Sequence, residues 1–415
     1  AGSAPLLHTP LPPKAWSGPA SGRREGKGGE RATTTASTMV ANRAASSLAL
    51  LASFALALAP FPTPAQGASE GGVKELYRFY TSDWVQATPA YSAAEGLLFI
   101  TSLDHNAYGV DAATGQARWQ AMTYGVVRSS PVVEDGVVYF GSADQKVYAL
   151  AAGTGAVLWK TETGGEVVAT PLVHGGVVYV GSWEDHALNA LHARSGEVLW
   201  KAQTRGHIRG TAAAHKDLVL IGSEDSFLYA FSAADGSLAW AFETNGDVFA
   251  TPVVEKGVVY FGSWDSCFYA VDGDTGNEVW KVEFLEGHVD GGAAVADGRV
   301  FFGTLGGVLY AVDIVTGGHL WEFRMATDET SGSVADTPVI RDGLVYFGSW
   351  DGFLYCLDAT TGAEVWRTEI GAKMSGSPLL VDSMPGKVFV GAEDGSLRAL
   401  AVPRAIARAP PPPPP

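Results

Sequence analysis

The sequence predicts an all-β fold, an eight-bladed β-propeller whose blades are four-stranded antiparallel sheets. Three observations lead to this prediction. One motif recurs at intervals of about forty residues, each repeat contains four short strand patterns, and incomplete units at the two ends complement each other. A period of this length with four strands per unit is typical of a propeller, in which the sheets pack face to face around an axis.

The motif is clearest at residues 270–280, which read Ala-x-Asp-x-x-Thr-Gly-x-x-x-Trp. The Asp and Thr oxygens can cap free amides of a tight turn, the Gly can adopt a positive φ, and the Trp anchors the next strand. The tryptophan recurs at spacings of 40, 41, 40, 40, 41 and 45 residues, at Trp119, Trp159, Trp200, Trp240, Trp280, Trp321 and Trp366. Because the copies stay in phase, we interpret the motif as architecture.

Each unit is expected to hold four strands. In the fifth unit we place them at residues 248–254, 257–263, 267–272 and 278–283. An Asp-Gly or Lys-Gly pair, as at residues 135–136 and 256–257, separates the first two strands of a unit, which is a strong hairpin signal.

The two ends of the repeat region complete each other. After Trp366 the chain has three more strand patterns but no further Thr-Gly-x-x-x-Trp, and residues 75–79 match the missing fourth strand, with Tyr77 at the tryptophan position. We therefore predict that the N-terminal strand closes the last blade, which leaves no open edge in the ring.

The recurring motif resembles the tryptophan-docking motif of the pyrroloquinoline-quinone (PQQ) repeat family, over residues 73–403. In the WD-repeat family the Trp-Asp pair ends the third strand, whereas the pairs at 264–265 and 350–351 follow the second. Within the PQQ-repeat family, the chain is more similar to the BamB-like propeller lipoproteins of outer-membrane β-barrel assembly than to the PQQ-dependent dehydrogenases. This resemblance implies a non-catalytic scaffold that binds protein or peptide partners through one face. The leader departs from that branch because no Cys follows its apolar run.

The dehydrogenase branch remains the alternative, a PQQ- and Ca²⁺-dependent enzyme that oxidises an alcohol or a sugar. The resemblance to that branch implies long insertions, a Ca²⁺ site, a catalytic Asp and often two adjacent cysteines. Here the blades are near minimal length, the largest insertion lies around residues 327–331, and Cys267 and Cys356 fall in units that are not neighbours. A calcium site needs six or more oxygen ligands, and none can be assembled from Glu166, Asp247, Asp290 and Asp336. We assign no catalytic residue and no cofactor, and keep PQQ with Ca²⁺ under the alternative only.

Three regions are expected along the chain. Residues 1–72 form a leader with an apolar core at 48–59, preceded by Arg43 and followed by small residues at 65–68, which is the order of an export signal. Alternatively, the leader is a two-part transit peptide to an organelle lumen such as the thylakoid. Residues 73–403 form the propeller, and residues 404–415 a disordered Pro-rich tail. The folded domain is therefore expected outside the cytosol, secreted, periplasmic or lumenal.

Charge and hydropathy limit the classes of partner that the folded region can bind. Residues 73–403 carry 20 Lys and Arg against 41 Asp and Glu, which argues against nucleic acid or an anionic membrane as a partner. No apolar run in this region is long enough to cross a membrane. We expect a monomer that binds a protein or peptide.

One face of the predicted propeller collects residues that depart from the repeat. The blade-to-blade connections and the hairpins between second and third strands lie on this face. The candidate binding residues are Trp183, Trp264 and Trp350 in the hairpins and Arg128, Arg209, His207, Asp247, His288 and Asp290 near the axis. Grouped exposed aromatic side chains indicate an interaction site, although the tryptophans could instead brace neighbouring blades. No metal site is expected, because His207 and His288 are two blades apart.

Overall fold

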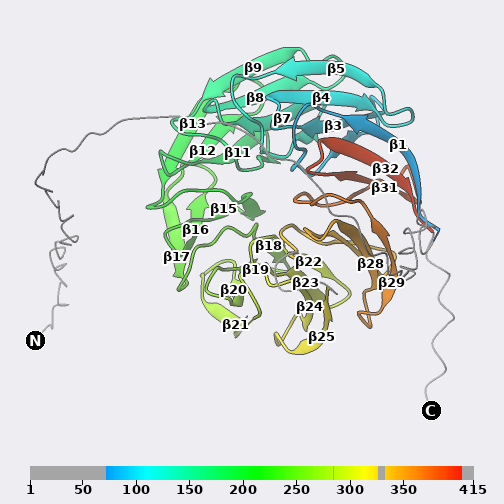
Figure 1. Ribbon diagram of the computed structural model, residues 1–415. Helices are drawn as coiled ribbons and strands as arrows, with labels where there is room; N and C mark the ends of the chain where they lie inside the picture. Colours follow the sequence, from blue (N-terminus) through cyan, green and yellow to red (C-terminus); the bar gives the residue numbers. More distant parts are fainter. Residues whose placement is uncertain (1–71, 284, 326–331, 404–415) are drawn as a thin grey trace, which may run out of the picture. The chain divides into compact units, whose positions relative to one another are not determined.

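The computed structural model describes residues 72–283, 285–325 and 332–403, which form a ring of eight four-stranded antiparallel sheets (Figure 1). The predicted all-β, eight-bladed propeller is therefore confirmed. Within the described residues there is no helix long and apolar enough to span a membrane. The predicted tail, and the predicted leader apart from Gly72, lie outside the described residues.

The strands of each blade follow one another in sequence, from the axis outward, except in the last blade. The first four blades contain β2 (Ala90–Ser92), β3 (Leu97–Thr101), β4 (Asn106–Asp111) and β5 (Ala117–Met122); β6 (Val132–Glu134), β7 (Val137–Ser142), β8 (Lys146–Ala151) and β9 (Val157–Glu162); β10 (Leu172–His174), β11 (Val177–Ser182), β12 (Ala187–His192) and β13 (Val198–Gln203); β14 (Ala213–His215), β15 (Leu218–Gly222), β16 (Phe227–Ser232) and β17 (Leu238–Glu243). The next three contain β18 (Val253–Glu255), β19 (Val258–Gly262), β20 (Phe268–Asp272) and β21 (Glu278–Val282); β22 (Ala294–Ala296), β23 (Arg299–Gly303), β24 (Val308–Asp313) and β25 (His319–Arg324); β26 (Val339–Arg341), β27 (Leu344–Gly348), β28 (Phe353–Asp358) and β29 (Glu364–Glu369).

The eighth blade joins the two ends of the chain. Its strands are β30 (Leu379–Leu380), β31 (Lys387–Gly391), β32 (Ser396–Ala401) and β1 (Lys74–Tyr80), which lies beside β32 in Figure 1. The pairing of β1 with β32 runs from Lys74 opposite Ala401 to Tyr80 opposite Ser396. The predicted closure by the N-terminal strand is therefore confirmed.

The innermost strands are shorter than predicted. The first strand of the fifth blade, expected at 248–254, is only Val253–Glu255, and its other three strands fall within a residue or two of the expected bounds. Pro252 has no N–H to donate to a ladder, and Phe249 and Thr251 before it line a cavity inside the ring of blades. The repeat therefore predicts the order of the strands better than their ends.

The motif tryptophans join each blade to the next. The Trp119 ring lies so close to Gly155 of the next blade that an added Cβ there would be 2.7 Å from it, and its Nε1 donates to the carbonyl of Ala152 at 2.8 Å. In the closing blade, the Tyr77 hydroxyl makes the corresponding bond to Ala112 at 2.9 Å. The buried indole N–H of Trp366 has no partner in the described part of the chain, because the blade it faces ends without a Thr-Gly turn.

A glycine substitution tests this contact. Gly276 has φ 72° and would place a Cβ 2.7 Å from the Trp240 ring, whereas Gly175 has φ 60° and open space around it. Both alanine variants incur the left-handed backbone cost, so Gly276→Ala should lose about 1–3 kcal/mol more unfolding free energy than Gly175→Ala. Urea denaturation measures both variants, and equal losses would show that the tryptophan contact contributes nothing.

Candidate functional site

The surface formed by the blade-to-blade connections and the hairpins between second and third strands is called the hairpin face here. Backbone hydrogen bonds tie each connection to the following hairpin, as from the Leu103 amide to the Trp84 carbonyl at 3.0 Å and from the Trp264 amide to the Asp247 carbonyl at 2.9 Å. The predicted grouping of connections and hairpins on one face is thus present.

A recurring aspartate fixes the hairpins on this face. Asp265 accepts hydrogen bonds from the Tyr269 hydroxyl at 2.6 Å, from the Asn245 amide at 3.0 Å and from the Cys267 amide at 3.0 Å. Burial alone would raise the pKa of Asp265, but these donors bring it below its usual value. The Asp therefore stays ionised and holds the connection, the hairpin and the third strand together.

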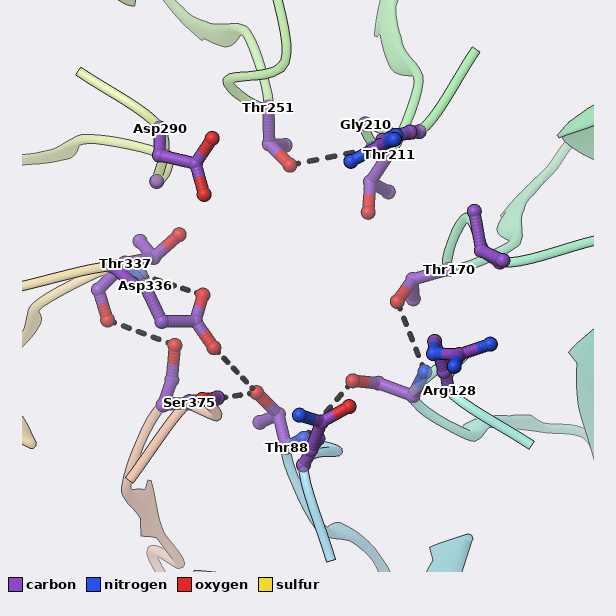
Figure 2. A pocket seen from close by; sticks show the side chains of 18 of the residues that line it. Thr88, Arg128, Thr170, Gly210, Thr211, Thr251, Asp290, Asp336, Thr337 and Ser375 are labelled. Atoms are coloured by element: carbon purple, nitrogen blue, oxygen red, sulfur yellow. Dashed lines mark hydrogen bonds between the residues drawn. The ribbon is translucent and has the colours of Figure 1, made fainter. Parts of the chain in front are cut away.

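A cavity of about 530 Å³ lies inside the ring of blades (Figure 2). Seven blades contribute a hydroxyl side chain at the same repeat position, just before their innermost strand. These are Thr88, Ser130, Thr170, Thr211, Thr251, Thr337 and Ser377. Gly292 occupies the position in the sixth blade.

Neighbouring blades share hydrogen bonds around this cavity. The Ser377 amide donates to Thr88 Oγ1 at 2.8 Å, the Thr88 amide to Ser130 Oγ at 2.9 Å, and the Ser130 amide to Thr170 Oγ1 at 3.1 Å. Each hydroxyl thereby satisfies an amide that has no ladder partner so close to the axis. The hydroxyl positions therefore hold the wall in place and give it a polar lining.

The charged groups on the wall lie on different blades. Arg128 and Arg209 come from the second and fourth blades, and Asp290 and Asp336 from the sixth and seventh. Arg209 forms an ion pair with Glu224 at 2.7 Å, whereas Arg128 has no ion pair or hydrogen bond to another described residue. Figure 2 shows the two aspartates on one side of the cavity and Arg128 on the other.

The predicted polar residues separate into two groups. Arg128, Arg209 and Asp290 line the cavity. His207 and His288 lie beside the tryptophans instead, with ring centroids 5.3 Å from Trp183 and 5.0 Å from Trp264 respectively.

Asp247 contributes its backbone carbonyl to Trp264. The Arg209 guanidinium lies 4.4 Å from the centre of the Trp183 ring, and Trp264 Nε1 donates to Asp290 at 3.0 Å. Trp350 lies 4.9 Å from the Lys373 ammonium. The structure therefore places Trp183 and Trp264 against the cavity-lining residues Arg209 and Asp290, and Trp350 against Lys373.

The three hairpin tryptophans are half-buried, which corrects the expectation that they are exposed. Each packs against a polar side chain of a connection, so the bracing interpretation accounts for much of their surface. The exposed large side chains of this face are ones that the sequence did not single out. They are Trp84, Tyr80, Met122 and Tyr124, which are 46%, 59%, 72% and 78% exposed.

Two repeat positions mark residues that the sequence analysis did not assign to the binding site. Trp84 stands four residues before Thr88, the same register as His207 before Thr211 and His288 before Gly292. Asp336 stands where the other blades carry Ala87, Ser129, Ala169, Gly210, Ala250, Gly291 and Gly376. The insertion in the seventh unit offsets the register there, which concealed this departure.

Comparisons with known proteins support the predicted resemblance. The family described as "Outer membrane protein assembly factor BamB" matches four overlapping stretches, 103–211, 184–283, 265–352 and 306–405. A sequence search of curated proteins gave no match.

Three similar solved structures share the fold. The crystal structure of BamB from Moraxella catarrhalis is 20% identical, with a TM-score of 0.67 over 81% of this chain and 99% of that chain. A europium-containing methanol dehydrogenase is 15% identical, with a TM-score of 0.68 over 80% and 93%. The computationally designed Ika8 protein is 18% identical, with a TM-score of 0.69 over 79% and 99%. Because the family matches extend from residue 103 to residue 405, well over half of the sequence, this chain belongs to the family of the outer membrane protein assembly factor BamB.

Proposed function

We propose that this protein is a non-catalytic, extracytoplasmic scaffold that binds a protein or peptide partner through its hairpin face. The observation that carries the proposal is the group formed by Tyr80, Trp84, Met122 and Tyr124, called the apolar sector here. Its members lie on or beside two successive connections, from the eighth blade to the first and from the first to the second. Membership of a family named for an assembly factor supports the same function.

The apolar sector differs from the other exposed apolar residues. On the outer strands, one residue before each tryptophan position, the exposed apolar side chains recur from blade to blade as Leu76, Leu158, Leu199, Val279, Leu320 and Val365. Because these side chains recur at one repeat position, we attribute their exposure to the structural repeat. The apolar sector is confined to two connections and includes a Trp and two Tyr, the residue types that dominate binding energy in protein interfaces. Its confinement favours a specific interface.

The location and the oligomeric state are part of this proposal. We infer that the leader is an export signal or a two-part transit peptide and that the propeller acts as a monomer outside the cytosol. The BamB-family relationship supports a location outside the cytosol. The excess of acidic side chains favours a partner with basic groups around an apolar centre.

The alternative, a PQQ-dependent dehydrogenase, has less support. The similar dehydrogenases are 15% identical to this chain, and at that level the similarity extends to the fold alone. Cys267 and Cys356 are free and lie in separate blades, and burial raises the pKa of both thiols. No group of three His, Cys, Asp or Glu that could hold a metal is present among the described residues. The described residues thus offer neither such a group nor a pair of adjacent cysteines, and we derive no reaction step.

A binding experiment tests the apolar sector. Once a partner has been isolated from a periplasmic or lumenal extract, Trp84→Ser with Tyr124→Ser should weaken its binding by about 30-fold or more, because aromatic hot spots contribute about 2 kcal/mol or more. Leu158→Ser with Val279→Ser, on the outer strands, is the matched control and should leave the affinity unchanged. Surface plasmon resonance measures both.

Two outcomes would contradict the proposal. An unchanged affinity after the aromatic substitutions would show that the apolar sector is not the interface. The variants Trp183→Ala, Trp264→Ala and Trp350→Ala would then test whether the hairpin tryptophans form it instead. Dye reduction that requires an alcohol, PQQ and Ca²⁺ would establish an enzyme instead.

A further inference from the structure

The two carboxylates on the cavity wall accept hydrogen bonds only from neutral donors, although the charges of Arg209 and His288 partly oppose the effect of burial on the pKa of Asp290. Asp336 accepts from its neighbour's amide, Thr337, at 2.6 Å and from the Thr88 hydroxyl at 3.3 Å, and Asp290 accepts from Trp264 Nε1. Neither forms an ion pair with any residue that the structure describes. Burial raises the pKa of both groups. A carboxylate in this environment gains free energy from any cation that can reach it.

The repeat shows that Asp336 is not needed to build a blade. The corresponding position in the seven other blades is an Ala, Ser or Gly, and those blades close normally. A charged group that departs from a structural repeat and faces a cavity is more readily explained by a ligand than by folding.

The neighbouring sixth blade is shaped around the same place. It carries Gly291 and Gly292, and an added Cβ at these positions would lie 2.8 Å from the Asp336 backbone and 2.4 Å from Thr337 Oγ1. The glycines therefore allow the segment with Asp336 to approach the sixth blade, which carries Asp290. Figure 2 shows both carboxylates on this side of the cavity.

The opposite side of the cavity offers a cation. Arg128 is exposed and unpaired among the described residues, whereas Arg209 is held by Glu224 and by the rings of Trp183 and Phe249. A volume of about 530 Å³ is within the range of small-molecule sites. The ring of hydroxyl groups adds donors and acceptors without adding charge.

We propose that this cavity binds a small zwitterion, of the size of an amino acid or a dipeptide. Its protonated amine lies between Asp290 and Asp336, and its carboxylate faces Arg128. The site is distinct from the apolar sector and does not depend on a protein partner, so it goes beyond the scaffold function.

Calorimetry with the full chain tests the proposal, with L-alanyl-L-alanine as the probe. We expect saturable binding, with affinity at least about tenfold weaker for the N-acetylated and for the C-amidated dipeptide, since each lacks one charge-assisted set of hydrogen bonds. Trp264 fluorescence should change with the same midpoint, because its indole contacts Asp290. No binding of the free dipeptide, or equal binding of the blocked forms, would overturn the proposal.

The variant Asp336→Ala separates a ligand site from a structural bond. It restores the type of residue found in the other blades, so we expect it to abolish dipeptide binding while Tm stays the same or rises. Asp297→Asn, on the opposite face, removes one negative charge and should bind the dipeptide like the unchanged protein. A fall in Tm of Asp336→Ala without any ligand binding to the unchanged protein would identify Asp336 as a structural link. Partner binding by Asp336→Ala should be normal, which keeps this test independent of the scaffold proposal.

Discussion

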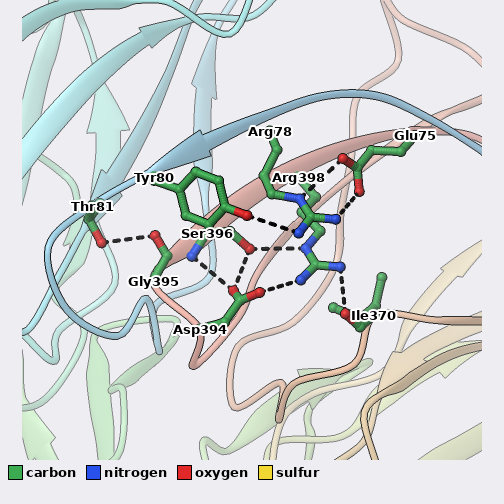
Figure 3. A network of polar contacts seen from close by, with 9 residues as sticks. All are labelled: Glu75, Arg78, Tyr80, Thr81, Ile370, Asp394, Gly395, Ser396 and Arg398. Atoms are coloured by element: carbon green, nitrogen blue, oxygen red, sulfur yellow. Dashed lines mark hydrogen bonds and ion pairs between the residues drawn. The ribbon is translucent and has the colours of Figure 1, made fainter.

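Arg398→Ala is expected to lower the free energy of unfolding by about 3 kcal/mol, the lower end of the range for breaking a buried ion pair. Arg398 is only 4% exposed and forms an ion pair with Asp394 (Figure 3). It also donates to the Ile370 carbonyl at 2.5 Å and to Ser396 Oγ at 3.0 Å. The alanine variant would leave Asp394 without its cation and the Ile370 carbonyl without its donor. These contacts connect the closing blade to the seventh.

Arg398→Tyr is the matched control for this prediction. Arg398 occupies the position at which six other blades have a tyrosine, and in five of them the tyrosine hydroxyl donates to the hairpin aspartate at 2.5–2.8 Å. A tyrosine at 398 should therefore recover much of the lost stability. Urea denaturation followed by tryptophan fluorescence gives both values. If Arg398→Ala unfolds at the same urea concentration as the unchanged protein, the ion pair does not hold the closing blade.

The difference in unfolding free energy between Arg398→Ala and the unchanged protein should depend on pH, and the direction follows from the pKa of Asp394. Burial raises the pKa of Asp394, but the Ser396 hydroxyl and the Arg398 guanidinium outweigh it, and the pKa lies below its usual value. A carboxyl group whose pKa is lowered in the folded state stabilises the folded protein at pH values above its unfolded pKa of about 4. This contribution is lost as the pH falls from there through the folded-state pKa. The stability difference between Arg398→Ala and the unchanged protein should therefore be full at pH 7 and shrink below about pH 4.

Most of the fold could be predicted because one short motif also specifies how neighbouring blades contact each other. The tryptophan of each unit rests on the glycine turn of the next, so the phase of the motif sets the number and the order of the blades. Tyr77 marks the closing strand because its hydroxyl bonds the next blade as the tryptophans do. Strand ends were harder to predict, because the polar segments at the axis bond through Thr and Ser hydroxyls, which leave no apolar alternation.

The candidate site could be predicted only in part. Arg128, Arg209 and Asp290 were found because they depart from the repeat within intact units. Asp336 was considered only as a possible calcium ligand, because the insertion before it offsets the register of the seventh unit. Trp84 was missed although it stands in register with His207 and His288. The exposure of Trp183 could not be predicted either, since it depends on Arg209 and His207 from the next connection.

Deletion of β1 is expected to have the largest effect of all. A chain that begins at Thr81 loses the whole pairing with β32, the buried Val73, and the bond from Tyr77 to the first blade. It exposes β32 as an open edge and leaves the ring unclosed. We expect the loss of essentially all net stability, about 5–15 kcal/mol, with aggregation in place of a cooperative transition.

A rearranged (permuted) chain, in which β1 follows β32 in the sequence, keeps the strand but changes its position. It shows whether the ring needs the strand itself or its place at the N-terminus. Lys74 pairs with Ala401, so residues 74–80 can follow Ala401 through the Ala-Ala-Thr-Gly turn of residues 112–115. This permuted chain should fold and elute as a monomer, because every pair of strands is kept. The new turn also offers Trp366 the carbonyl and the glycine that it lacks, so Tm should equal or exceed that of the natural order. If the deleted chain melts cooperatively near the Tm of the full chain, or if the permuted chain fails to fold, closure by β1 is not what holds the ring together.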